Sequence, residues 1–113
     1  MEITKEVVDQ LKQAHPDVEL HKLSTTMPSG ETVEGVVRVP TRAEWKMSRE
    51  LVASGDAAKR VAAASVLFNA CVLYPSGTTR ELLVAKRPGI VDVWAGEIGE
   101  LAGIVQGTRV EKL

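Results

Sequence analysis

The chain has 113 residues with 14 basic and 15 acidic side chains, so its formal net charge is −1. This length suits one domain with a modest core, and the near-neutral charge argues against a dedicated nucleic-acid binder, which usually carries a strong basic excess. The single cysteine excludes an internal disulfide and fits a reducing cytoplasm. No run of about 18 apolar residues is present to cross a membrane, so we expect a cytoplasmic protein without a membrane partner.

The start of the chain has a helical pattern. Apolar residues recur there at the spacing of one helix face: Ile3, Val7, Val8, Leu11 and Ala14. This pattern predicts a helix over roughly 4–14. It should end at His15, because Pro16 disfavours the helical conformation in the residue before it.

A β-hairpin is predicted next. Val18 and Leu20 alternate with polar residues in the segment 17–27, and the segment 32–39 is rich in β-branched residues. Between them, the sequence Pro-Ser-Gly-Glu at 28–31 is typical of a chain reversal. Because a lone hairpin is marginally stable, it should pack on helices or on another copy of the chain.

After Pro40 the sequence indicates four helices, over 42–52, 57–72, 78–85 and 90–102. Thr41 and Glu44 have the spacing of a capping box, Asp56 can cap the next helix, and the Thr-Thr-Arg-Glu sequence at 78–81 offers a second capping box. We therefore expect an α+β fold with an N-terminal β-hairpin packed on a mainly helical bundle of about four helices. Residues 1–103 should form this single domain, and residues 104–113, which have no clear pattern, should form a flexible tail.

Nothing in the sequence predicts a catalytic, cofactor or metal site. His15 and His21 have no partner at metal-ligand spacing. Cys71 could act as a nucleophile with His21 as its base, but Cys71 lies on an apolar helix face and is better explained as a small buried side chain. The segment 96–100 contains two glycines but lacks a phosphate-loop motif, which favours close helix packing instead. We therefore expect no enzyme activity.

The remaining signal is apolar and points to a protein partner. Large apolar side chains can serve the core or an interface, and tryptophan and tyrosine often carry interface energy. We expect a binding groove between the helices over 57–72 and 90–102. The candidate partner-binding residues are Val61, Phe68, Trp94, Ile98 and Leu101. An uncovered hairpin edge would also favour self-association.

Four segments resemble one known family. The sequence Val-Arg-Val-Pro-Thr-Arg-Ala-Glu-Trp at 37–45, the sequence Ala-Cys-Val-Leu-Tyr-Pro-Ser at 70–76, and the segments 87–91 and 97–103 are similar, in order, to motifs of small phage tail assembly chaperones. The resemblance spans about residues 17–103 and consists of structural punctuation and apolar spacing. Arg87 stands where that family often has an aromatic residue, and Gly96 and Gly99 replace better helix formers.

The resemblance implies a function without catalysis. Such chaperones are encoded upstream of the tape measure protein of long-tailed phages and prophages. They coat this long apolar helical protein in the host cytoplasm before tail tube subunits assemble around it, and tube subunits are a second expected partner. Three alternatives remain open: a structural virion component such as a tail or head-completion subunit, a cysteine-dependent enzyme, and a small DNA-binding regulator with two successive helices.

Overall fold

A computed structural model describes residues 3–103 and 110–112. The tail predicted at 104–113 therefore lies largely outside the described residues. The elements follow the order α1 (Lys5–Ala14), β1 (Leu20–Thr26), β2 (Thr32–Arg38), α2 (Arg42–Ala53), α3 (Ala57–Cys71), β3 (Val72–Tyr74), α4 (Gly77–Lys86) and α5 (Ile90–Leu101). The predicted α+β class with an N-terminal hairpin is confirmed.

The sheet has three antiparallel strands in the order β1-β2-β3. The hairpin turn closes through two backbone hydrogen bonds: the Met27 N–H donates to the Glu31 carbonyl oxygen at 2.7 Å, and the Gly30 N–H donates to the Met27 carbonyl oxygen at 2.8 Å. Gly30 has a φ of +89°, so glycine is needed at this reversal.

The third strand was not predicted, since the helix of residues 57–72 was expected to continue through Val72. Instead α3 ends at Cys71, and Val72–Tyr74 pairs with β2. Two local preferences explain the change. Val72 is β-branched and favours an extended backbone, and Pro75 disfavours a helical conformation at Tyr74.

The helix starts after Pro40 follow two of the three predicted caps. Thr41 and Glu44 form the expected capping box, and the Asp56 carboxylate accepts a hydrogen bond from the Ala58 N–H at 2.9 Å. The capping box predicted at 78–81 is wrong. Helix α4 begins at Gly77, so Thr78 already lies inside it, and the residue at the cap, Ser76, makes no side-chain hydrogen bond to the helix.

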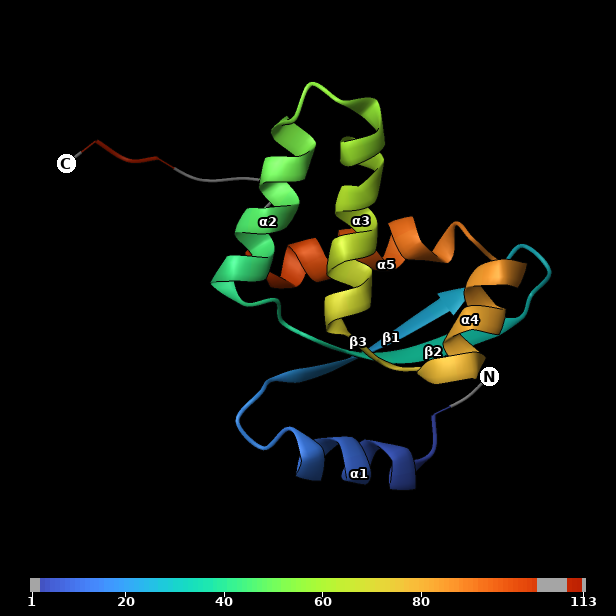
Figure 1. The fold of residues 1–113 in the computed structure, drawn as a ribbon. Helices are drawn as coiled ribbons and strands as arrows, with labels where there is room; N and C mark the ends of the chain where they lie inside the picture. Colours follow the sequence, from blue (N-terminus) through green and yellow to red (C-terminus); the bar gives the residue numbers. More distant parts are fainter. Residues whose placement is uncertain (1–2, 104–109, 113) are drawn as a thin grey trace.

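The sheet separates two unequal layers (Figure 1). Helices α3 and α5 lie on one face and build the main core with the sheet, whereas α1 lies on the opposite side. Helix α1 contains no buried residue, and the Ile3 N–H just before it donates to Glu34 Oε1 at 2.9 Å. The buried core is made of Val33, Val37, Leu67, Phe68, Cys71, Val72, Leu83, Ile90, Trp94, Ala95 and Ile98.

Trp94 fixes α5 against the hairpin. Its indole N–H donates to Thr25 Oγ1 at 2.8 Å, and its ring centre lies 6.1 Å from that of Phe68. The ring also lies directly against Gly35, where an added Cβ would overlap indole atoms Cη2 and Cζ3. The absence of a side chain at Gly35 therefore sets how closely α5 approaches the sheet.

Candidate functional site

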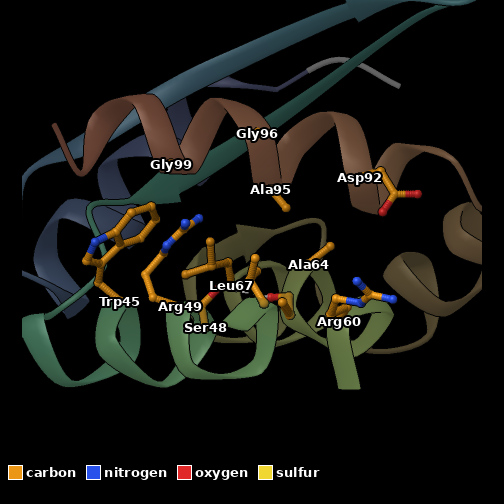
Figure 2. Close-up of a pocket in the computed structure, with 12 residues that line it drawn as sticks. Trp45, Ser48, Arg49, Arg60, Ala64, Leu67, Asp92, Ala95, Gly96 and Gly99 are labelled. Carbon is orange, nitrogen blue, oxygen red and sulfur yellow. Dashed lines mark hydrogen bonds between the residues drawn. The ribbon is translucent and has the colours of Figure 1, made fainter. Parts of the chain in front are cut away.

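An open groove of about 280 Å³ lies between α5 and the antiparallel pair α2 and α3 (Figure 2). Its lining comes from all three helices: Trp45, Ser48, Arg49 and Val52 of α2, Arg60, Ala63, Ala64 and Leu67 of α3, and Asp92, Ala95, Gly96 and Gly99 of α5. Apart from a few polar and charged groups, these side chains are apolar or small. The groove can therefore accept small or narrow apolar groups of a binding partner.

The α5 wall is low because it carries glycine at two lining positions. Asp92, Gly96 and Gly99 follow the i, i+4, i+7 spacing of one helix face. Gly96 is exposed, and a Cβ added there would meet nothing within 4 Å. A partner can consequently approach the α5 backbone closely along this face.

The α2 wall is held at its start by an ion pair to the end of β2. Both guanidinium nitrogens Nη1 and Nη2 of Arg38 donate to Glu44, at 2.7 Å to Oε1 and 2.7 Å to Oε2. Glu44 Oε1 also accepts a hydrogen bond from the Thr41 N–H at 2.8 Å. The hydrogen bonds from Arg38 chiefly hold the pKa of Glu44 at about 2, although partial burial acts in the opposite direction.

A buried hydrogen bond joins α2 to α3. Ser48 is the buried polar residue of α2, and its hydroxyl donates to the Ala63 carbonyl oxygen at 3.3 Å. This contact belongs to the groove wall, since both residues line the groove. The two helices therefore form one wall with a fixed spacing.

The structure contains a groove near the predicted position, but the residues predicted to line it do not do so. A groove does lie along α3 and α5, with α2 as an additional wall, but none of the five candidate residues lines it. Phe68, Trp94 and Ile98 are at most 2% exposed and belong to the core. Leu101 is partly buried against the core, and Val61 is 75% exposed on α3 away from the groove lining.

The physical reason is that the large apolar side chains of α3 and α5, such as Phe68, Trp94 and Ile98, are buried in the core. The groove is lined by other positions of these helices, among which small and charged residues are common. Sequence reasoning missed Trp45, Arg49 and Gly96 for this purpose. A usable signal was present in the helical spacing of Trp45 and Arg49 on α2 and of Asp92, Gly96 and Gly99 on α5.

Two further pockets contain basic side chains that contact other parts of the fold. A pocket of about 400 Å³ lies beside the hairpin turn, and its basic residues Lys86 and Arg87 face Glu31 at 4.0 and 3.9 Å. A pocket of about 440 Å³ between α3 and α4 contains Arg80, whose guanidinium donates to the Val72 carbonyl oxygen at 3.2 Å. The groove between α2, α3 and α5 differs in that its charged lining residues Arg49, Arg60 and Asp92 form no ion pair with another described residue.

Cys71 has the environment of a structural residue. Its side chain is fully buried, and burial raises the pKa of its thiol to about 11, so the reactive thiolate is scarce at neutral pH. His21, the residue considered as its base, instead has Nε2 at 3.1 Å from Glu19 Oε1.

Within residues 3–103 and 110–112, no three His, Cys, Asp or Glu side chains are grouped so that they could hold a metal ion. In the same part of the chain, the helices are too short or too polar to cross a membrane.

Comparisons with known proteins give information on the fold but none on the function. No protein family and no curated protein matches the sequence. The fold is similar to the solved structure of the uncharacterised protein rbstp2171 from Bacillus stearothermophilus, with a TM-score of 0.72 and 15% sequence identity. The similarity covers 92% of this chain and 99% of that one. At this identity the likeness concerns the fold alone, so the arrangement of sheet and helices is one that another natural protein also adopts.

Proposed function

We propose that this protein is a tail assembly chaperone of a bacteriophage or prophage, which binds the tape measure protein and shields its apolar helical surface during tail assembly in the host cytoplasm. The groove between α2, α3 and α5 is the observation that carries the proposal. The resemblance of the segments 37–45, 70–76, 87–91 and 97–103 to chaperones of this kind supports it from the sequence.

The groove suits one mode of recognition. An amphipathic helix can lay its apolar stripe into a groove of this kind, which removes apolar surface from water at roughly 25 cal/mol per Å². The exposed backbone at Gly96 gives the incoming helix room for close contact. Because the groove is short and open, each copy would bind weakly, and many copies along a long partner would protect it while remaining removable.

Self-association is part of the proposal. Strand β1 is an edge of the sheet, since it pairs with β2 on one side in the strand order β1-β2-β3. An uncovered edge strand offers backbone N–H and C=O groups to a second strand. Copies seated side by side on a tape measure protein would be linked through this edge, and tail tube subunits would displace them later.

The decisive experiment fills the groove without disturbing the core. We expect Gly96→Leu to abolish capture of the co-expressed tape measure protein, which the proposal expects to be the product of a very long helix-rich reading frame directly downstream, because the new side chain would occupy the groove. The matched control is Glu97→Leu, which adds the same side chain to the exposed side of α5 outside the groove. Both variants should be at least as thermally stable as the parent chain.

Capture that survives Gly96→Leu would contradict binding in the groove. Trp94→Ala is unsuitable as a test, since Trp94 is fully buried and its loss would damage the core. A second measurement separates the proposal from the alternative of a structural virion component. Mass spectrometry of purified particles should not detect a chaperone, whereas a virion component would be present.

A further inference from the structure

The groove has two rims of opposite charge. Arg49 of α2 and Arg60 of α3 stand on one side, and both are exposed. On the other side, Asp92 and Gly96 of α5 line the groove, and Glu100 follows Gly96 by four residues on the same ridge, just beyond the lining residues. This ridge has an exposed carboxylate at each end and a glycine in the middle. Helix α5 contains no basic residue.

Among the residues that the structure describes, these rim charges have no ion-pair partner. In the described part of the chain, the ion pairs near the groove join Arg38 to Glu44 and Lys46 to Glu50. Neither the two rim arginines nor the two rim carboxylates form an ion pair with another described residue. The Arg49 guanidinium instead lies 5.7 Å from the ring centre of Trp45, which keeps it at the groove wall.

Figure 2 shows Arg49 and Arg60 on one side of the groove and Asp92 on the other. Arg49 and Arg60 extend from the α2 and α3 wall, and Asp92 stands on the α5 side near the end where Arg60 lies. From Asp92 to Glu100 the ridge is about 12 Å long, because a helix rises about 1.5 Å per residue. This length matches about two turns of a docked helix.

We propose that the groove takes an amphipathic helix whose apolar stripe is bordered by carboxylates on one side and by basic side chains on the other, an inference that rests on the proposed function. The carboxylate border meets Arg49 and Arg60, and the basic border meets Asp92 and Glu100. Small and apolar side chains of the stripe lie over Ala64, Ala95 and Gly96, and the rest of the lining excludes water around them.

This arrangement also fixes the direction of the docked helix. If a helix is turned end to end with its apolar stripe still facing the groove, its two borders exchange sides. The carboxylates would then face Asp92 and Glu100, which is repulsive, and the basic side chains would face Arg49 and Arg60. The rim charges therefore select one direction as well as one charge pattern.

The test uses two synthetic helical peptides of identical composition and identical apolar stripe, without tryptophan. One carries glutamates along one border and lysines along the other, and the second has glutamate and lysine mixed on both borders. We expect the full chain to bind the segregated peptide several-fold more tightly by fluorescence anisotropy at low salt. Arg49→Gln with Arg60→Gln should remove most of this preference, at about two- to fivefold for each arginine.

The matched control is Lys46→Gln with Lys59→Gln, which removes the same number of charges from α2 and α3 at exposed positions outside the groove. This control should keep the preference. A spin label at the peptide N-terminus gives the direction: it should broaden backbone amide signals near either Gly99 or Asp92, and exchanging the two borders should move the broadening to the other end.

Equal affinity for the two peptides, or no binding of either, would overturn the inference. So would broadening at both ends of the groove with the segregated peptide. Failure of the proposed function gives a different result, because a tape measure protein that is not captured in co-expression leaves the preference for the segregated peptide in place.

Discussion

Gly35, which lies in β2 against the core side of α5, and Gly96, which lies in α5 on its groove side, have opposite surroundings. Gly35 of β2 lies under the indole of Trp94, where no side chain fits, and a Cβ there would also come to 2.9 Å from the Tyr74 carbonyl oxygen. Gly96 of α5 faces the groove, where an added Cβ would meet nothing within 4 Å. The first glycine permits a tight internal contact between the sheet and α5. The second leaves space that the fold itself does not use, which is what a binding surface requires.

The largest expected effect comes from adding a methyl group at the internal glycine. Gly35→Ala should lower the free energy of unfolding by about 2–3 kcal/mol, because either the rigid indole of Trp94 or the strand must move. Urea unfolding followed by circular dichroism measures the change. If the overlap with the indole causes this loss, the effects of substitutions at Gly35 and Trp94 should be coupled. In a Trp94→Phe background, where the six-membered ring of the indole is absent, Gly35→Ala should lower the free energy of unfolding by less. An equal cost in both backgrounds would contradict direct overlap with Trp94.

The part of the fold predicted from the sequence is the part set by local chemistry. The Pro-Ser-Gly-Glu reversal at 28–31, the capping box of Thr41 and Glu44, and the cap at Asp56 each depend on residues close in the chain. Strand β3 and the fit between Gly35 and Trp94 depend on pairing between distant segments. A glycine in a strand pattern indicates a bulge or a close approach but does not name its neighbour.

The site was harder to predict than the fold for a related reason. Tryptophan, phenylalanine and isoleucine in a small domain serve first to build the core, and Trp94, Phe68 and Ile98 do so here. The groove is lined largely by small and charged residues of the three helices. Residues of these types are common on any helix surface, so they do not by themselves indicate a binding site. The position between the helices of 57–72 and 90–102 could be predicted from their apolar content. The lining could be predicted only in part. The helical spacing shows which residues share a face of α2 or of α5, but which faces meet depends on how α2 packs against both other helices.

A smaller effect is expected at the ion pair that holds the start of α2, and it sharpens the comparison by testing the groove wall opposite Gly96. Glu44→Gln should lower the free energy of unfolding by about 1–2 kcal/mol at pH 7, since Arg38 loses its charged partner. The pKa of Glu44 is lowered from 4.5 to about 2 in the folded chain. Its stabilising contribution is therefore complete above pH 4.5 and is lost as the pH falls toward 2.

The measurement for this ion pair is a series of unfolding curves for the parent chain and Glu44→Gln between pH 7 and pH 2. The difference in stability should shrink across the range from 4.5 to 2. Glu50→Gln is the matched control on the same helix, because Glu50 is exposed and lies 3.9 Å from Lys46; its effect should stay below about 0.5 kcal/mol. A difference between parent and Glu44→Gln that stays constant with pH would contradict the assigned role of the carboxylate.

The smallest expected effect has the opposite sign and returns to the second glycine. Gly96→Ala should raise the free energy of unfolding by about 0.5–1 kcal/mol, because alanine costs less conformational entropy in a helix and its methyl group meets open space. Thermal unfolding of Gly96→Ala beside Gly35→Ala measures both signs in one experiment. Destabilisation by Gly96→Ala would mean that the groove is filled by the fold and is not open to a partner. If the variant is stabilised and also binds its partner less well, then Gly96 is retained at a cost to stability for the sake of the groove, and binding is the reason that this helix contains a glycine.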